Sequence, residues 1–205
     1  MGRVSEKLIV MTRFPEVGKV KTRLAAGIGE EQACEVHRML VHSCLEATEG
    51  WDGSVEIRMT GGSADERSSW LGGATVRDQG GGDLGARLKR ATAAAFEEGA
   101  ERVVVIGTDC PELDDDLLRE AFAGLGEAEV VLGPAADGGY YLIGLSRRAD
   151  GMFESIPWGG PEVMERSLDR ARELGLSVAR LRVLRDIDTR RDLEEFPGIL
   201  RRLRP

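Results

Sequence analysis

The sequence lacks paired cysteines and long apolar runs. Its 205 residues include three cysteines, Cys34, Cys44 and Cys110, which are widely spaced and form no CxxC motif. This pattern predicts neither a disulfide framework nor a zinc site. No run approaches the roughly 18 apolar residues that a membrane span needs, and the first residues lack the apolar region and cleavage site of a signal peptide. We therefore expect a cytoplasmic protein with reduced thiols and no membrane partner.

Basic residues are outnumbered by acidic ones, and histidine is scarce. The chain has 28 Lys and Arg against 36 Asp and Glu, a net charge of -8, and two histidines. Proteins that bind nucleic acids usually carry basic faces, so we expect no nucleic-acid partner and only a local anion site. His37 and His42 are five residues apart, which is poor spacing for one shared metal on a helix. Cys110 lacks a candidate base and is expected to be structural.

Apolar β-rich runs alternate with helical patterns along the chain. The runs cover residues 8–11, 55–59, 74–76, 103–106, 130–132, 140–145 and 178–183, and the helical patterns cover 30–48, 84–98, 115–125 and 161–174. Such alternation predicts an α/β fold with a mainly parallel sheet between two helical layers. Because no linker or repeat interrupts the pattern and 41% of the residues are hydrophobic, we expect one domain over residues 1–205.

The run Val103 to Ile106 leads directly into Gly107, Thr108 and Asp109. A continuous apolar run is typical of a central strand that is buried on both faces. Asp109 therefore follows the carboxyl end of a strand, where open α/β sheets bind their ligands. The alternative is that Asp109 only accepts hydrogen bonds from amides of its own loop.

A basic loop follows the first predicted strand, in residues 12–24. Its cations are Arg13, Lys19, Lys21 and Arg23, with Gly18 and Thr22 between them. A glycine-containing loop that leads into a helix presents backbone N–H groups to a phosphate, and cations add charge-assisted hydrogen bonds. The loop does not match the GxxxxGK[ST] motif of P-loop proteins. The alternative is a basic turn that only faces solvent.

A second acid, Asp188, follows the last predicted strand. Thr189 and Asp192 have the spacing of a capping box, which leaves Asp188 without a local structural task. Asp109 and Asp188 would meet at neighbouring strand ends and offer two oxygen ligands to Mg²⁺ or Mn²⁺, a common arrangement when substrate phosphates complete the coordination.

Two glycine-rich segments are further candidates for ligand contact. Gly82 and Asp83 precede a predicted helix that Asp83 would cap, so the flexible loop fits either a nucleotide contact or a plain helix start. Asp137, Gly138 and Gly139 precede a strand, where the glycines would let the backbone approach a ligand closely. An ordinary tight turn explains this segment equally well.

In combination, FPEVGKVKTRL, GGDLGARL, GTDCPEL, GPAADGGYYLIGL, IPW and DIDTRRDL resemble the bacterial glycosyltransferase-like family known as domain of unknown function 2064. That family is similar to 2-phospholactate guanylyltransferase and, more distantly, to molybdenum cofactor guanylyltransferase. The resemblance implies the GT-A fold of nucleotide-diphospho-sugar transferases, a three-layer α/β/α arrangement with a Rossmann-like mixed sheet. The chain differs at Gly159 and Gly160, where the resemblance predicts Ser and Thr.

The resemblance implies that Asp109 and Asp188 are metal ligands and that Lys19, Lys21 and Arg23 form the loop that binds the nucleotide phosphates. We further expect Lys21 to act with the two acids in catalysis. Together with the loops considered above, the expected nucleotide contacts are Arg13, Gly18, Lys19, Lys21, Thr22, Arg23, Gly82, Asp83, Thr108, Asp137, Gly138 and Gly139.

The expected activity is transfer from a nucleotide-activated donor to a small-molecule acceptor with Mg²⁺ or Mn²⁺. The family label favours glycosyl transfer from a nucleotide-sugar. The basic loop suits nucleotidyl transfer from a nucleoside triphosphate, and a nucleotide-binding regulator without turnover is the third interpretation. The sequence leaves the oligomeric state open.

Overall fold

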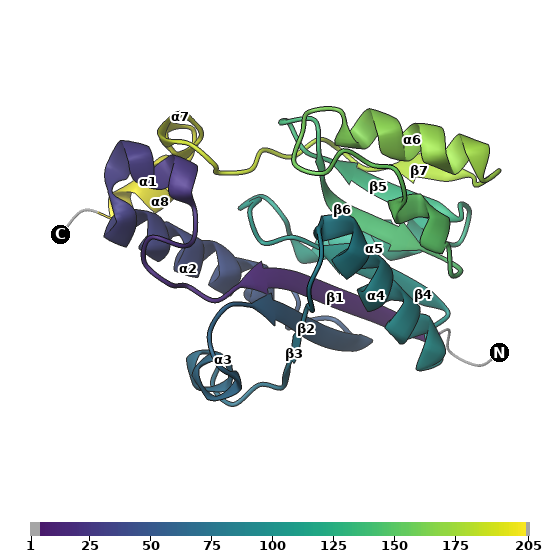
Figure 1. The fold of residues 1–205 in the computed structure, drawn as a ribbon, viewed down its shortest axis with the longest axis horizontal. Coiled ribbons are helices and arrows are strands. Elements are labelled where there is room, and N and C mark those ends of the chain that lie inside the picture. Colours follow the sequence, from purple (N-terminus) through teal and green to yellow (C-terminus); the bar gives the residue numbers. More distant parts are fainter. Residues whose placement is uncertain (1–4, 204–205) are drawn as a thin grey trace.

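The computed structural model describes residues 5–203. They contain a seven-stranded sheet (Figure 1). Its order is β3-β2-β1-β4-β6-β5-β7. The strands are β1 (Glu6–Arg13), β2 (Ser54–Thr60), β3 (Val76–Asp78), β4 (Arg102–Ile106), β5 (Val130–Pro134), β6 (Tyr140–Leu145) and β7 (Val178–Arg180). β6 is antiparallel to both neighbours, whereas the other pairs are parallel. The mainly parallel mixed sheet that the sequence predicts is confirmed.

Helices cover both faces of the sheet. They are α1 (Thr22–Ile28), α2 (Glu30–Glu46), α3 (Ala64–Trp70), α4 (Leu84–Glu97), α5 (Asp115–Gly124), η1 (Asp150–Phe153), α6 (Val163–Glu173), α7 (Arg190–Glu194) and α8 (Pro197–Arg202). None of those in residues 5–203 combines the length and the apolar character needed to cross a bilayer.

The alternation of side chains along each strand explains the three layers. In β4, Val104 and Ile106 pack with α5, while Val103 and Val105 face α4, η1 and α6. Because successive strand residues point to opposite faces, a fully apolar strand serves two cores at once. A third cluster joins α1, α2, α7 and α8 at the end of the molecule where the chain terminates (Figure 1).

Helix caps mark several boundaries that the sequence predicts. The carboxylate of Asp83 accepts a hydrogen bond from the amide of Ala86 at the start of α4, and Asp114 does the same for Leu117 in α5. Thr189 and Asp192 form the expected capping box of α7. The box at α3, made by Ser63 and Glu66, is a capping motif that the hydrophobic pattern alone does not reveal.

The two short edge strands are displaced or shortened relative to their predicted bounds. The run at residues 74–76 becomes β3 at Val76–Asp78, and the run at 178–183 becomes β7 at Val178–Arg180. Val183, the last residue of the predicted run, is 62% exposed. Short edge strands have one hydrogen-bonded neighbour, so their ends depend on tertiary contacts rather than on local pattern.

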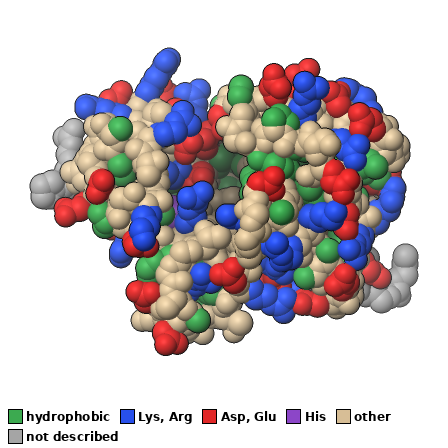
Figure 2. Space-filling model, viewed as in Figure 1, with side chains coloured by type: hydrophobic (Ala, Val, Ile, Leu, Met, Phe, Trp, Pro, Cys, Tyr) green, Lys and Arg blue, Asp and Glu red, His purple; other side chains and the backbone are tan. Residues whose placement is uncertain are grey.

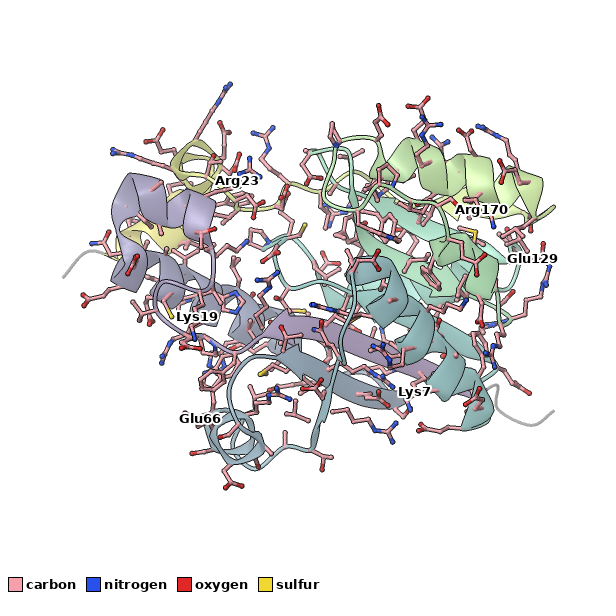
Figure 3. The ribbon with its side chains drawn as sticks, viewed as in Figure 1. Lys7, Lys19, Arg23, Glu66, Glu129 and Arg170 are labelled. Atoms are coloured by element: carbon pink, nitrogen blue, oxygen red, sulfur yellow. The ribbon has the colours of Figure 1, made fainter. Side chains whose placement is uncertain are left out.

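A group of charged residues on β1 and β2 is buried beside the apolar core. Lys7 and Glu56 are buried and their charged atoms lie 2.7 Å apart, and Arg58 donates to the same carboxylate. Glu98 adds a second carboxylate to Lys7 (labelled in Figure 3). Burial of charge is tolerated here because each charged group has a partner of opposite sign.

We predict that Leu142→Ala, in the centre of β6, lowers the free energy of unfolding by about 2 to 5 kcal/mol, because truncation leaves a cavity in a packed core. Leu142 is fully buried. Val183→Ala, at an exposed site, should change the value by no more than about 0.5 kcal/mol. Urea unfolding measures both, and equal losses in the two variants would contradict this description of the core.

Candidate active site

A cleft of about 730 Å³ lies over the carboxyl ends of β1 and β4 and the start of β6. In the space-filling view the surface is hollowed here, with acidic and basic side chains gathered around the hollow (Figure 2). The polar wall comes from the basic loop, the segment after β4 and Asp188. The other wall is largely apolar and comes from α4, β6 and Trp158, with Arg87 of α4 as its charged residue.

Lys21 brings the two predicted acids together. Its Nζ lies 2.7 Å from Oδ1 of Asp109 and 3.1 Å from Oδ1 of Asp188. The side chain of Lys21 is 5% exposed, whereas those of Asp109 and Asp188 are 50% and 31% exposed. The buried ammonium group thus joins two carboxylates that remain open to the cleft.

Electrostatics keep Lys21 charged in this position. Burial by itself would lower the pKa of its amine, but the charges and hydrogen bonds of Asp109 and Asp188 outweigh burial and raise the pKa. The backbone of Lys21 has φ 48° and ψ 43°, in the left-handed region that non-glycine residues avoid at a cost of roughly 1 to 2 kcal/mol. The ion pairs offset this cost.

The backbone around Asp188 fixes its position independently of its side chain. The amide of Asp188 donates to Oδ2 of Asp192, and the amide of Ile187 donates to the carbonyl oxygen of Asp109 at 3.0 Å. Arg23 adds a contact of 3.2 Å between Nη1 and Oδ2 of Asp188. The segments after β4 and before α7 are therefore joined by both backbone and side-chain contacts.

The side chain of Asp109 does not stabilise its own turn in the described part of the chain. Between residues 5 and 203, its carboxylate accepts no hydrogen bond from a backbone amide, and its partner is Lys21. This geometry weighs against the interpretation that Asp109 only satisfies its own loop.

The basic loop borders the cleft with most of its predicted contact residues. Arg13, Lys19, Thr22 and Arg23 line the cleft together with Lys21, and Lys19 and Arg23 are labelled at this end of the molecule in Figure 3. The side chain of Lys19 is highly exposed, and its Nζ lies 2.5 Å from Oε1 of Glu16. Gly18 does not line the cleft; its φ of 77° serves the loop conformation.

His37 is a cleft residue that the sequence does not reveal. Its Nε2 lies 2.9 Å from the carbonyl oxygen of Arg13, at the start of the basic loop. Burial lowers the pKa of His37, which outweighs the opposing effect of that carbonyl oxygen. The neutral ring donates through Nε2 and holds the loop against α2. Only its position on the buried face of α2 could have signalled this role.

The loop before α4 is tied down by hydrogen bonds, although its glycines suggest flexibility. The side-chain amide of Gln79 donates to the carbonyl oxygens of Thr12 and Arg58, and Arg90 donates to those of Gln79 and Gly81. Gly82 has φ 95° and lies outside the cleft lining, whereas Asp83, Gln79 and Arg87 line it.

Trp158 and Tyr140 form the aromatic part of the apolar wall. Their rings meet edge to face with centroids 6.2 Å apart. The indole packs on Gly85 so closely that a Cβ there would lie 2.3 Å from Nε1. Asp83, which caps α4, and Gly159 also line the cleft.

The Asp137–Gly139 segment lies outside the cleft lining. The carboxylate of Asp137 accepts a hydrogen bond from the amide of Gly139, and a Cβ at Gly138 would meet the carbonyl oxygen of Pro161 at 2.1 Å. These contacts are those of a tight turn, and a ligand contact by these residues remains a prediction. Thr108 does line the cleft, where its hydroxyl group lies 3.1 Å from that of Thr12.

The donor set fits a divalent cation that also binds substrate phosphates. Asp109 and Asp188 supply hard oxygen atoms, and Mg²⁺ or Mn²⁺ commonly uses one or two carboxylates together with phosphate oxygens. Within residues 5–203 no group of three or more Asp, Glu, His or Cys could hold a metal ion by itself. The arrangement therefore suits a metal bound jointly with a ligand rather than a closed protein cage.

Residues 42–160 match the model of a family described as an uncharacterized protein conserved in bacteria, DUF2064. The chain belongs to this family. No curated protein is significantly similar to it in sequence.

Solved structures extend the comparison over nearly the whole chain. A candidate nucleotide-diphospho-sugar transferase from Desulfovibrio desulfuricans G20 is 30% identical, with a TM-score of 0.87 over 98% of this chain and 99% of that chain. Rv0371c from Mycobacterium tuberculosis H37Rv, crystallised with manganese, is 19% identical, with a TM-score of 0.57 over 94% and 97% of the two chains. The inositol-1-phosphate CTP transferase from T. maritima is 14% identical, with a TM-score of 0.56 over 98% and 97%.

These similarities confirm the predicted family and the GT-A-like α/β/α fold. The 30% identical relative also supports the prediction that the protein is an enzyme of the transferase type. The two more distant structures contribute the fold alone.

We predict that Gly85→Ala destabilises the protein by about 1 to 3 kcal/mol, because the added methyl group overpacks a close contact. Its Cβ would also lie 2.8 Å from the carbonyl oxygen of Phe153. Thermal unfolding and tryptophan fluorescence measure the loss of stability and the altered environment of the indole. Gly81→Ala, where a Cβ would meet open space, is the control; equal behaviour of both variants would contradict the tight seating of Trp158.

Proposed function

We propose that the protein is a metal-dependent transferase that uses a nucleotide-activated donor. The single observation that carries this proposal is the contact of Lys21 with both Asp109 and Asp188 in a cleft bordered by Lys19 and Arg23. Two carboxylates can bind Mg²⁺ or Mn²⁺, which would neutralise the charge on a diphosphate. The neighbouring cations would stabilise the charge that develops on the leaving group.

The first candidate reaction is glycosyl transfer from a nucleotide-sugar to a small-molecule acceptor. The 30% identical relative from Desulfovibrio desulfuricans is described as a candidate nucleotide-diphospho-sugar transferase, and this similarity supports a donor of that class. In such a reaction a nucleoside diphosphate leaves, and its phosphate groups would lie beside the metal and the basic loop. The protein would act mainly by positioning and electrostatics.

The second candidate is nucleotidyl transfer from a nucleoside triphosphate. It is favoured by the number of cations around the cleft, since Arg13, Lys19, Arg23 and Arg87 line it in addition to Lys21. A triphosphate carries more negative charge than the diphosphate of a nucleotide-sugar. The T. maritima structure, a CTP transferase of similar fold, is compatible with this reaction.

The released product distinguishes the two reactions. Glycosyl transfer releases a nucleoside diphosphate, whereas nucleotidyl transfer releases pyrophosphate. We would screen nucleoside triphosphates and nucleotide-sugars by thermal shift with and without Mn²⁺, because a ligand at 100 times its dissociation constant stabilises by roughly 2.7 kcal/mol. The donors that bind would then be assayed for each product. Binding without any turnover would support a nucleotide-binding regulator instead.

We predict that Asp109→Asn reduces turnover by about 100-fold or more while the protein remains folded. Asparagine keeps the side-chain shape but lacks the negative charge, and each tenfold in rate corresponds to about 1.4 kcal/mol of lost transition-state stabilisation. Turnover and thermal unfolding should be measured together. Asp65→Asn, an exposed acid in α3, is the charge-matched control. A folded Asp109→Asn variant with normal turnover would overturn the role of Asp109 as a metal ligand.

We predict that Arg23→Ala weakens binding of nucleoside di- and triphosphates by about tenfold, because a charge-assisted hydrogen bond contributes roughly 1.5 to 3 kcal/mol. Binding of the plain nucleoside should change little, since the guanidinium group would contact phosphate rather than base. Calorimetry measures both affinities. Arg172→Ala in α6 is the control because its side chain has nearly the same exposure, 70% against 69%. Unchanged phosphate affinity in Arg23→Ala would mean that the loop only faces solvent.

A further inference from the structure

Lys21 occupies the position where its ammonium group satisfies both carboxylates of the cleft. Its Nζ is within 3.1 Å of Asp109 and Asp188, and its side chain is almost fully buried between them. A phosphate-binding lysine needs its ammonium group free for the ligand. In this structure that group already contacts two carboxylates of the protein.

We propose that Lys21 is an exchangeable internal counter-ion. In the free protein its single positive charge pairs with Asp109 and Asp188, and it leaves them for the ligand's phosphate groups when the two carboxylates bind a divalent cation. This inference rests on the proposed function. It adds the requirement that the metal ion and the phosphate groups bind together rather than independently.

The charge balance of the cleft is the first argument. Asp109 and Asp188 carry two negative charges, Lys21 returns one positive charge to both, and Arg23 contacts the second oxygen of Asp188. A divalent cation alone would therefore meet carboxylates whose charge is largely compensated. Close opposite charges interact more strongly in a partly buried site than in water, so Lys21 competes effectively for these oxygens.

The way in which Lys21 is held is the second argument. Its backbone lies in the left-handed region, with φ 48°, so local conformational preference does not favour the observed geometry. The two ion pairs supply the stabilisation, and they can be replaced by other ionic contacts. Lysine is also a flexible point charge without fixed directional geometry, which suits a group that changes partners within one cleft.

The neighbouring cations are the third argument. Lys19 and Arg23 border the cleft on the same loop as Lys21, so a phosphate group attracted by this loop would offer the Lys21 ammonium group a new anionic partner. The positive charge would then be transferred from the carboxylates to the ligand, and both carboxylates would be released at the moment when a metal–phosphate complex needs them.

A permanent clamp is the opposing interpretation. If Lys21 only held the two acids together, its removal would let like charges repel and separate, and the affinity for a divalent cation would not rise. If Lys21 is a competing counter-ion, its removal exposes two adjacent carboxylates and the affinity rises. The two interpretations therefore predict opposite results from one variant.

The test measures Mn²⁺ binding by electron paramagnetic resonance without any nucleotide. Lys21→Met should bind Mn²⁺ about tenfold or more tightly than the wild type, which corresponds to about 1.4 kcal/mol. Lys89→Met, which removes a positive charge from an exposed site in α4, is the matched control and should bind like the wild type. The double variant Lys21→Met/Asp109→Asn should lose the gain. Affinity of Lys21→Met equal to or below that of the wild type would overturn the proposal.

A second measurement uses the wild-type protein and does not depend on the folding of a variant. In ¹⁵N NMR, the Nζ resonance of Lys21 should stay in place with Mg²⁺ alone and shift when Mg²⁺ and pyrophosphate are added together, while the Nζ resonance of Lys89 stays unchanged. An unchanged Lys21 resonance at saturating Mg²⁺ and pyrophosphate would also overturn the exchange.

Failure of this inference can be told apart from failure of the proposed function. Wild-type binding of Mn²⁺ in the presence of pyrophosphate, with no gain in Lys21→Met, would overturn the counter-ion role alone. Absence of Mn²⁺ binding in every protein, with and without pyrophosphate, would overturn the metal site and the exchange together.

Discussion

The ion pairs of Lys21 join three segments that are far apart in sequence, namely the loop before α1, the turn after β4 and the segment before α7. The positive charge between the two carboxylates offsets their mutual repulsion in this partly buried cleft. The hydrogen bond from Ile187 to Asp109 depends on the same approach of the two segments. The packing of α7 and α8 on α1 and α2 depends on this approach as well, because the chain must cross back over the sheet to reach α1 and α2.

The strand order explains why this contact forms at the carboxyl ends of β1 and β4. The sheet grows from β1 toward β2 and β3 on one side and toward β4 and β6 on the other. The connections that follow β1 and β4 therefore diverge, and a crevice opens between them, as at other switch points of open α/β sheets. Thr12 and Thr108, whose hydroxyl groups are 3.1 Å apart, mark the floor of this crevice. The topology alone thus determines where charged loop residues can meet over the sheet.

The sequence predicts this topology class and the two acids because both leave local signals. A fully apolar run such as Val103–Ile106 indicates a central strand, and the capping box of Thr189 and Asp192 indicates a helix start that leaves Asp188 unused. The partners of these acids leave no such signal. Lys21, a predicted phosphate ligand, contacts the acids instead, and His37 and Gln79 act through loop carbonyl oxygens that only the folded chain brings near. The buried ion pair of Lys7 and Glu56 likewise depends on the register of β1 with β2.

The two walls of the cleft differ in how far they constrain the reaction. The polar wall has paired charges and backbone contacts at each acid, so a change there would disturb several interactions at once. The apolar wall is made of Trp158, Tyr140 and α4, and Gly159 borders it with φ 84° and free space where a side chain would begin. Gly159 and Gly160 are also where this chain departs from the Ser and Thr that its resemblance to the family predicts. Of these two residues, Gly159 lines the cleft next to Trp158, so the departure leaves the groups proposed to bind metal and phosphate intact. It alters instead the part of the cleft next to Trp158, and that part is where a difference in acceptor would be accommodated.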